Sequence, residues 1–189
     1  MKIVKEDLWS VDVNDTTKTC FVVTTSASLK QNSELVMGRG AAFDAVKRYG
    51  VYIRTMCGVL VKRHIGKKNF LTGGAGGPSL ENGTPLPADD HFAHDERFYG
   101  FICVSASIPA ERHSIPEEFG IFQTKRDWWE HARLDVIEKS TAMLTQHAKH
   151  HPDWKYRLNF PGIGNGHLAE EQVLPLLQGL PDNVTICRR

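Results

Sequence analysis

Two glycine-rich turns stand where the chain could bind a phosphate. The first is Met37-Gly38-Arg39-Gly40, and the second is Pro161-Gly162-Ile163-Gly164-Asn165-Gly166. Glycine lets backbone N–H groups approach a bulky anion, and the start of a following helix adds positive potential. For one such turn alone, the geometry of a strand-to-helix connection is the better explanation. Two of them in one domain favour a nucleotide-like ligand whose diphosphate is bound from both sides.

These turns differ from the common nucleotide-binding motifs. A P-loop would place Lys and then Ser or Thr after the last glycine, whereas here His167 and Leu168 follow. Neither turn is a GxGxxG sequence followed by a suitable acid, which disfavours a nicotinamide-dinucleotide dehydrogenase. Because histidine titrates near neutral pH, His167 could act as a general acid. An ordinary surface histidine is an equal alternative.

Hydrophobic patterning predicts the strands and helices that must position the turns. Strands are expected at residues 1–7, 20–25, 98–106, 119–124, 156–160 and 183–187. Helices are expected at residues 39–49, 51–61, 127–150 and 169–180. This alternation is typical of an α/β fold with a mainly parallel sheet covered on both faces. Ligands of such folds bind at the carboxyl ends of the strands, where both turns are expected.

The chain of 189 residues has the length of one domain. Residues 62–97 are rich in Gly, Pro, Asn and Asp, so we expect an irregular insertion there within a single domain spanning 1–189.

Trp128 and Trp129 are expected to begin the long helix. One of them should pack in the core and the other should wall the binding pocket.

Composition gives little reason to expect a membrane or bulk nucleic acid as partner. The formal net charge is +1, no apolar run approaches the roughly 20 residues of a membrane span, and the first ten residues are too charged for a signal peptide. A cytoplasmic location is therefore expected.

The four cysteines are widely spaced, which predicts buried free thiols rather than disulfides or zinc ligands. No metal ion or cofactor is expected.

Four sequence features occur in the order that is typical of a known family. They are residues 4–8 (VKEDL), 36–42 (VMGRGAA), 122–129 (FQTKRDWW) and 160–168 (FPGIGNGHL). Together they resemble the macrodomains, which bind ADP-ribose and have a three-layer α/β/α fold. The resemblance is greatest to the branch with DNA ADP-ribosyl glycohydrolase antitoxins, terminal ADP-ribose glycohydrolase and small phage-type macrodomains.

The resemblance implies roles for the residues that contact the ligand. Asp7, with Leu8 beside it, matches the acid that accepts a hydrogen bond from the adenine amino group. The turn at Met37, Gly38, Arg39 and Gly40 matches the loop along the distal ribose and the phosphates. The second phosphate loop corresponds to Gly162, Ile163, Gly164, Asn165 and Gly166. Ser26 stands where this branch usually has Asn near the distal ribose, which is a departure from the family pattern.

The resemblance also implies a catalytic lysine. Lys125 matches the lysine that attacks the anomeric carbon of the distal ribose or assists there electrostatically. A nucleophilic lysine needs a lowered pKa, and the neighbouring Arg126 could supply the second positive charge. Gly166 replaces an Asp that assists catalysis in one enzyme of the branch, which argues against an aspartyl-assisted mechanism. His167 would then be the candidate general acid.

Three functions remain open at this point. The first is hydrolysis of an ADP-ribosyl bond on DNA or protein by Lys125. The second is a binding module for ADP-ribose or a related NAD-derived nucleotide without turnover, which Ser26 and Gly166 favour. The third is a phosphatase acting on ADP-ribose 1″-phosphate with His167 as acid or base. The expected partner is ADP-ribose or an ADP-ribosylated macromolecule, with ADP-ribosylated DNA as one case, and the sequence leaves the oligomeric state open.

Overall fold

The computed structural model describes residues 1–10, 15–69, 98–104 and 117–188. Within these ranges a sheet has the strand order β1-β6-β5-β2-β4-β3. All neighbouring strands are parallel except β3 and β4, which are antiparallel. The strands are β1 Lys2–Val4, β2 Thr19–Ser26, β3 Phe101–Val104, β4 Glu117–Lys125, β5 Lys155–Asn159 and β6 Val184–Cys187.

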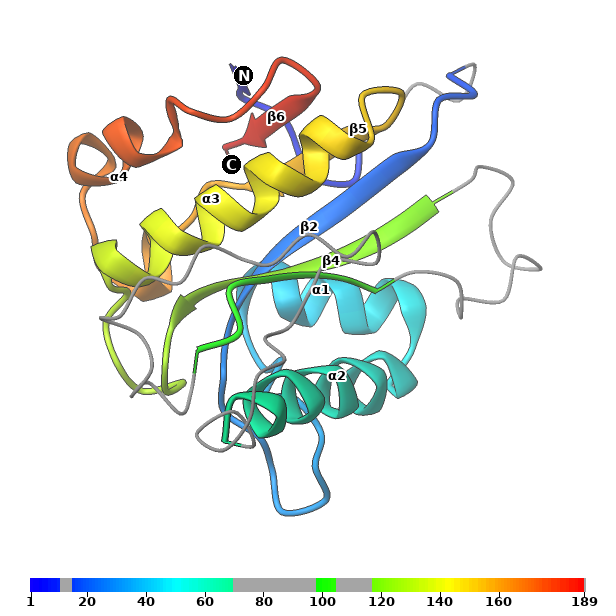
Figure 1. Cartoon of the computed structure of the whole chain (residues 1–189), viewed down its shortest axis with the longest axis vertical. Coiled ribbons are helices and arrows are strands. Elements are labelled where there is room, and N and C mark those ends of the chain that lie inside the picture. Colours follow the sequence, from blue (N-terminus) through cyan, green and yellow to red (C-terminus); the bar gives the residue numbers. More distant parts are fainter. Residues whose placement is uncertain (11–14, 70–97, 105–116, 189) are drawn as a thin grey trace.

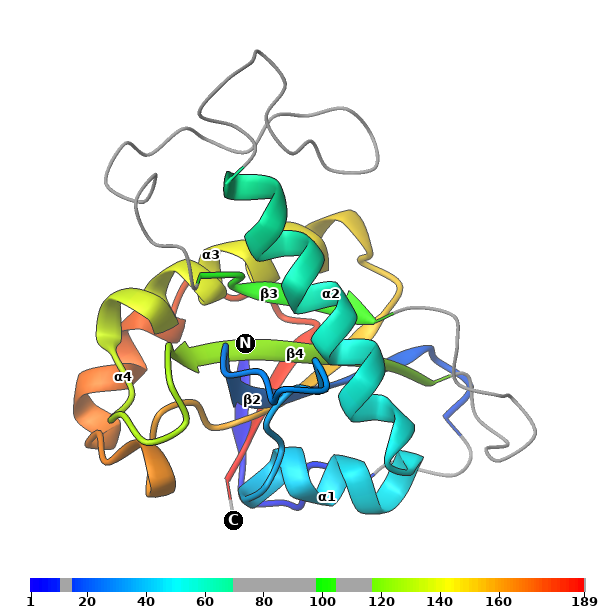
Figure 2. The same ribbon diagram turned by 90° about the horizontal axis from the view of Figure 1, so that it is seen from below.

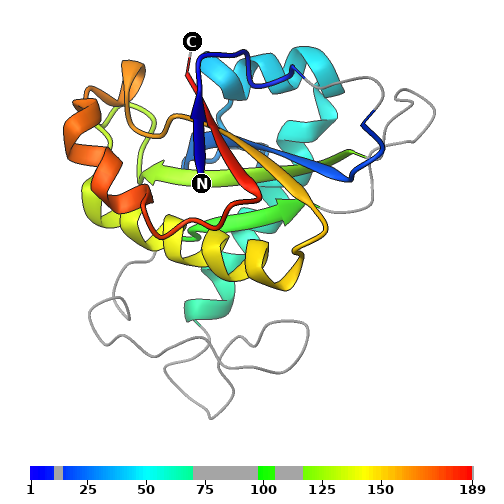
Figure 3. The same ribbon diagram turned by 90° about the horizontal axis from the view of Figure 1, so that it is seen from above.

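Helices cover both faces of this sheet and make three layers (Figure 1). They are α1 Gly40–Tyr49, α2 Tyr52–Asn69, α3 Leu134–His150 and α4 Glu170–Leu177. Helices α1 and α2 lie on one face, as Figure 2 shows, and α3 and α4 lie on the other, as Figure 3 shows. The expected α/β/α architecture with a mainly parallel sheet is therefore confirmed.

Strand β2 contributes side chains to both hydrophobic cores, one on each face of the sheet. Side chains along a strand alternate between the faces of the sheet. Phe21 and Val23 pack with α1 and α2, whereas Cys20 and Val22 pack with α3 and α4. Because both faces are buried, the strand reads as a continuous apolar run.

The long helix begins later than the sequence predicts. Helix α3 starts at Leu134, and the segment before it is a loop because its amide groups donate elsewhere. Ala132 N–H donates to the Gly166 carbonyl at 2.8 Å, and Arg133 N–H donates to the Thr124 carbonyl at 2.9 Å. Trp128 and Trp129 therefore lie in this loop, and the expectation that they begin the helix is wrong.

The proposed insertion also has a later start. Residues 62–69 continue helix α2, which corrects the expected irregular structure there. The rest of that segment, residues 70–97, lies outside the described residues.

The four cysteines are free thiols: Cys20, Cys57 and Cys187 are buried as expected, and Cys103 is half-buried. In the described part of the chain, no helix has the length and apolarity to cross a membrane.

Candidate functional site

A cavity of about 810 Å³ opens at the carboxyl ends of four adjacent parallel strands. The last residues of these strands, Ser26, Lys125, Asn159 and Cys187, all line it. This is the position where open α/β sheets bind ligands, and the volume is that of a site for a small molecule or nucleotide. The topology therefore brings residues from distant parts of the sequence to one site.

The two glycine turns face each other across this cavity. A Cβ atom on Gly40 would lie 3.8 Å from Nδ2 of Asn165, so the turns approach closely at one point. Away from it, a Cβ atom on Gly38 or Gly164 would have nothing within 4 Å. Gly40 and Gly164 both have positive φ, which glycine adopts without strain. The backbone of both turns is thus open to a ligand in the cavity.

Helix α1 adds positive potential to the first turn. The helix begins at Gly40, and the side chain of its N-cap residue Arg39 makes no capping hydrogen bond. Its first N–H groups therefore remain available to an anion beside Arg39, as at other helix N-termini that bind phosphate. Arg39 itself lines the cavity. The first turn is thus electrostatically suited to a diphosphate.

Close packing leaves no room for a side chain larger than that of glycine at Gly162 and Gly166. A Cβ atom on Gly162 would meet Cδ1 of Ile137 at 2.8 Å, and one on Gly166 would meet Cβ of Ala132 at 2.8 Å. The second turn is therefore packed against α3 and the loop that precedes it. An Asp at position 166 would require this loop to move, which explains in part why glycine stands there.

A β-bulge precedes Lys125. Thr25 pairs with Gln123, but the next residue of β2, Ser26, pairs with Lys125, so Thr124 is an extra residue in β4. Bulges of this kind redirect the following side chain and are common beside functional sites. The Lys125 ammonium group donates to the carbonyl oxygens of Glu130 at 2.9 Å and Asn165 at 3.3 Å. Lys125 therefore joins β4 to the second glycine turn.

The electrostatics of Lys125 differ in one respect from the sequence expectation. Its pKa is lowered from the ordinary lysine value chiefly because burial disfavours the charged form. The Glu130 carboxylate opposes this shift, and the positive charge of Arg39 adds to it. The cation that contributes is thus Arg39 from the first turn and not the adjacent Arg126.

The loop after Lys125 is held by a small polar network. Ser28 Oγ donates to Asp127 Oδ1 at 3.2 Å and accepts from Trp128 N–H at 2.9 Å. Asp127 N–H donates to Oε2 of Glu130 at 3.1 Å. These contacts fix the loop that carries the two tryptophans. Trp128 and Trp129 both line the cavity and are 55% and 64% exposed, so the expectation that one packs in the core is wrong.

His167 has a partner that the sequence reasoning missed. The ring of His131, in the loop before α3, lies 4.8 Å from the ring of His167 between centroids. Both histidines are exposed and line the cavity. His167 has a left-handed backbone with φ of 58°, and its N–H donates to the Gly164 carbonyl at 3.0 Å. No sequence motif joins the two, because the contact depends on how the loop folds back.

Ser26 and Asn159 are the last residues of β2 and β5, the middle two of the four strands that end at the cavity. Ser26 lines the cavity but is only 4% exposed, and its Oγ accepts from Ser28 N–H at 3.4 Å. Asn159 exchanges two hydrogen bonds with Thr24, one from the Thr24 N–H at 2.9 Å and one to its Oγ1 at 2.8 Å. Asn159 was not among the residues predicted for the site. Its only signal in the sequence is its place at the end of a strand, just before the second turn.

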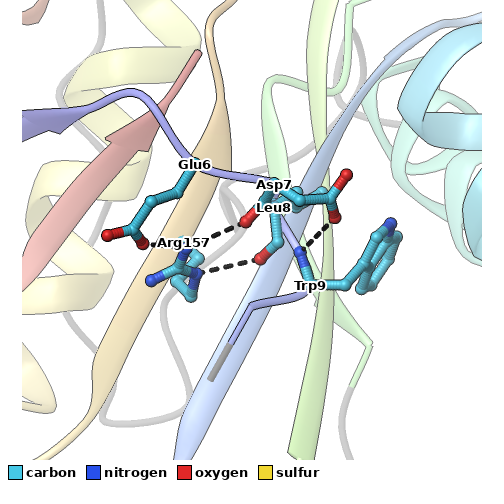
Figure 4. A network of polar contacts seen from close by, with 5 residues as sticks. All are labelled: Glu6, Asp7, Leu8, Trp9 and Arg157. Atoms are coloured by element: carbon cyan, nitrogen blue, oxygen red, sulfur yellow. Dashed lines mark hydrogen bonds and ion pairs between the residues drawn. The ribbon is translucent and has the colours of Figure 1, made fainter. Parts of the chain in front are cut away.

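The predicted adenine-binding residues lie at the rim of the cavity. Leu8 lines it and is buried, whereas Asp7 is exposed and lies between the lining residues Glu6 and Leu8 (Figure 4). Oδ1 of Asp7 accepts from Trp9 N–H at 2.9 Å. Met37 is 1% exposed, and its side chain packs in the core rather than lining the cavity. The structure therefore brings the predicted residues together, with Asp7 at the edge and the Met37 side chain beneath the surface.

The described residues contain no group of three or more His, Cys, Asp or Glu side chains placed to hold a metal ion. The polar groups of the cavity are peptide N–H groups, hydroxyls, carboxamides, two imidazoles, the carboxylates of Glu6 and Glu130, and the cations of Lys125, Arg39 and Arg188. Such a set suits an anionic, hydroxyl-rich organic ligand.

Solved structures of other proteins share this fold. The macrodomain of Thermus aquaticus DarG has a TM-score of 0.57 and 15% identity, over 99% of this chain and 95% of that chain. The macrodomain of Mycobacterium tuberculosis DarG has a TM-score of 0.55 and 18% identity, over 98% and 96% of the two chains. Thermosipho africanus DarTG in complex with ADP-ribose has a TM-score of 0.54 and 17% identity, over 92% of this chain but 38% of that chain. No sequence-family profile and no curated protein matches the chain.

Proposed function

Since the chain has the macrodomain fold, we propose that its cavity binds ADP-ribose and that Lys125 supports hydrolysis of an ADP-ribosyl bond. One observation carries this proposal: the two open glycine turns face each other across a cavity with Lys125 at its wall. The structure of DarTG, of which 38% of the chain matches this fold, is a complex with ADP-ribose. That likeness supports the choice of ligand.

The proposed pose follows from the polarity of the cavity. The diphosphate lies between the two glycine turns, near the start of α1 and Arg39, where peptide N–H groups and positive charge meet it. Adenosine then extends toward Leu8 and Asp7. The distal ribose extends toward Lys125, whose ammonium group is fixed by the Asn165 carbonyl. The anomeric carbon thereby comes within reach of Lys125, His131 and His167.

The proposed reaction uses Lys125 at the anomeric carbon. The neutral amine forms a C–N bond as the bond to the DNA or protein acceptor breaks, and the acceptor leaves with a proton. Water then hydrolyses the lysine adduct and regenerates the amine. The lowered pKa of Lys125 favours the neutral amine that this step needs. His167 or His131 lies on the same side of the cavity and is suited to protonate the acceptor.

One observation favours a binding module without turnover. The Lys125 ammonium group already donates to two carbonyl oxygens, so its role could be to tie β4 to the second turn. In that case Lys125 would preserve the shape of the ligand site without reacting. The two functions predict different behaviour of the same variant.

The test is release of ADP-ribose from ADP-ribosylated DNA and from an ADP-ribosylated glutamate peptide. Wild type should release ADP-ribose from one of them, and Lys125→Ala should lose at least about 100-fold in rate. Lys149→Ala, which removes an exposed lysine of α3, is the matched control and should keep the wild-type rate. Tight binding of ADP-ribose with no release from either conjugate would establish the binding module instead.

A further inference from the structure

Arg157 connects the strand β5 to the loop that follows β1. Its Nε donates to the Leu8 carbonyl at 2.9 Å. One of its terminal nitrogens donates to the Asp7 carbonyl at 3.0 Å and to the Glu6 carboxylate at 3.1 Å (Figure 4). The Arg157 side chain is 14% exposed and does not line the cavity. It contacts the residues at the adenine end of the proposed site but not the cavity itself.

The guanidinium group fixes the backbone of this loop. Its planar N–H groups point in set directions, so bonds to two successive carbonyl oxygens define the orientation of the two peptide groups that flank Leu8. Strand β1 ends at Val4, so the sheet no longer supports the chain at these positions. The ion pair with Glu6 adds little, because the Glu6 side chain is 52% exposed. The two carbonyl contacts are therefore the important ones.

A second anchor lies on the other side of Asp7. The Asp7 carboxylate accepts from Trp9 N–H, and the Trp9 ring packs 5.2 Å from Phe21 and 5.8 Å from Tyr49 between ring centroids. Leu8, between the two anchors, is 3% exposed. Asp7 thus projects from a loop that is held by Arg157 on one side and by Trp9 on the other.

We propose that Arg157 is a positioning residue that sets the nucleobase specificity of the cavity through Asp7. It holds the loop so that the Asp7 carboxylate accepts a hydrogen bond from an exocyclic amino group of the base. A carboxylate has several acceptor positions, so the bond from Trp9 leaves capacity for the base. This inference rests on the proposed function, because it assumes that a nucleotide enters the cavity.

The experiment compares two ligands whose bases differ in the proton carried on N1 and in the substituent at C6. ADP-ribose has an amino group there, and inosine diphosphate ribose has a carbonyl oxygen, which repels a carboxylate instead of donating to it. Calorimetric titration gives the affinity for each ligand with wild type, Arg157→Met and Arg157→Lys. Lys155→Met, on the same strand, is the matched control because Lys155 pairs only with Asp15 at the surface among the contacts described. Circular dichroism confirms that each variant folds.

The expected result is a change of selectivity. Wild type and Lys155→Met should bind ADP-ribose at least about tenfold more tightly than the inosine analogue, as expected for one hydrogen bond to a charged group. In Arg157→Met the affinity for ADP-ribose should fall about tenfold while that for the analogue changes less than about twofold. Arg157→Lys keeps the charge but loses the planar pair of donors, so it should not restore selectivity. If Arg157→Met fails to fold, the lysine variant carries the comparison.

Other outcomes would overturn the inference in distinguishable ways. If both Arg157 variants keep the wild-type selectivity, or lose affinity for both ligands equally, Arg157 does not set nucleobase specificity. Equal binding of both ligands by wild type would show that Asp7 does not read the amino group. Binding of neither ligand by wild type would contradict the proposed function itself.

Discussion

The ammonium group of Lys125 lies 3.3 Å from the carbonyl oxygen of Asn165. This hydrogen bond joins the last residue of β4 to the second glycine turn, 40 positions later in the chain. It places Lys125, the one lysine among the described residues that line the cavity, against the backbone that is proposed to bind the diphosphate. Catalysis and ligand binding would thus depend on the same contact.

The rate of ADP-ribose release should rise with pH through the pKa of Lys125. Burial lowers this pKa, so the neutral amine forms at a lower pH than for an exposed lysine. The rate should therefore level off below pH 10.5, the ordinary value. Single-turnover rates between pH 6 and pH 10 would measure this. A rate that does not rise anywhere between pH 6 and pH 10 would show that Lys125 acts as a cation and not as a nucleophile.

Two glycine substitutions should separate stability from binding. Gly166→Ala should lower the free energy of unfolding by about 1–3 kcal/mol, because its Cβ would lie 2.8 Å from Cβ of Ala132. Gly38→Ala should unfold like wild type, because no atom lies within 4 Å of its Cβ, but a methyl group there should weaken ADP-ribose binding. Denaturant unfolding and calorimetry measure the two effects. If Gly38→Ala bound ADP-ribose like wild type, the first turn would not be part of the site.

Sequence patterning was sufficient for the elements that hold this site. The glycine turns and the parallel strands could be predicted because buried strands and strand-to-helix turns have strong local signals. The start of α3 could not, because Ala132 and Arg133 donate to Gly166 and Thr124 rather than to their own helix. Such long-range hydrogen bonds leave no periodic trace in the sequence.

The same limit applies to details of the site. The bulge at Thr124 is visible only in the pairing of β2 with β4, and it lies directly before Lys125. His131 comes beside His167 only because the loop folds back. Met37 was assigned to the ligand because it belongs to the motif that resembles the family's first ligand loop, yet its side chain packs in the core. Resemblance identified the motif but not the direction of each side chain.

Cys103 should be the most reactive thiol of the chain. In the sheet, Cys103 of β3 pairs with Gly120 of β4. Cys20 of β2 lies on the other side of this glycine, and its Sγ would be 3.4 Å from a Cβ atom placed on Gly120. The missing side chain thus lets the two thiols meet across β4. Hydrogen bonds from Cys20 and then from His147 lower the pKa of Cys103, against the opposing effect of burial.

The other cysteines should stay protonated. Burial raises the pKa of Cys57 to about 12 and also raises the pKa values of Cys20 and Cys187. Iodoacetamide at pH 7 followed by peptide mass spectrometry should therefore modify Cys103 first, and Cys103→Ser should remove this early labelling. Faster labelling of Cys57 or Cys187 would contradict the described environments.

Calorimetric titration of the chain with ADP-ribose tests whether the two glycine turns form a nucleotide-binding site. Saturable binding of one molecule per chain is the predicted result, and it should weaken in Gly38→Ala because that methyl group enters the phosphate-binding region. No detectable binding of ADP-ribose to the folded wild-type chain would contradict the proposed site, because the two facing turns would then have another role.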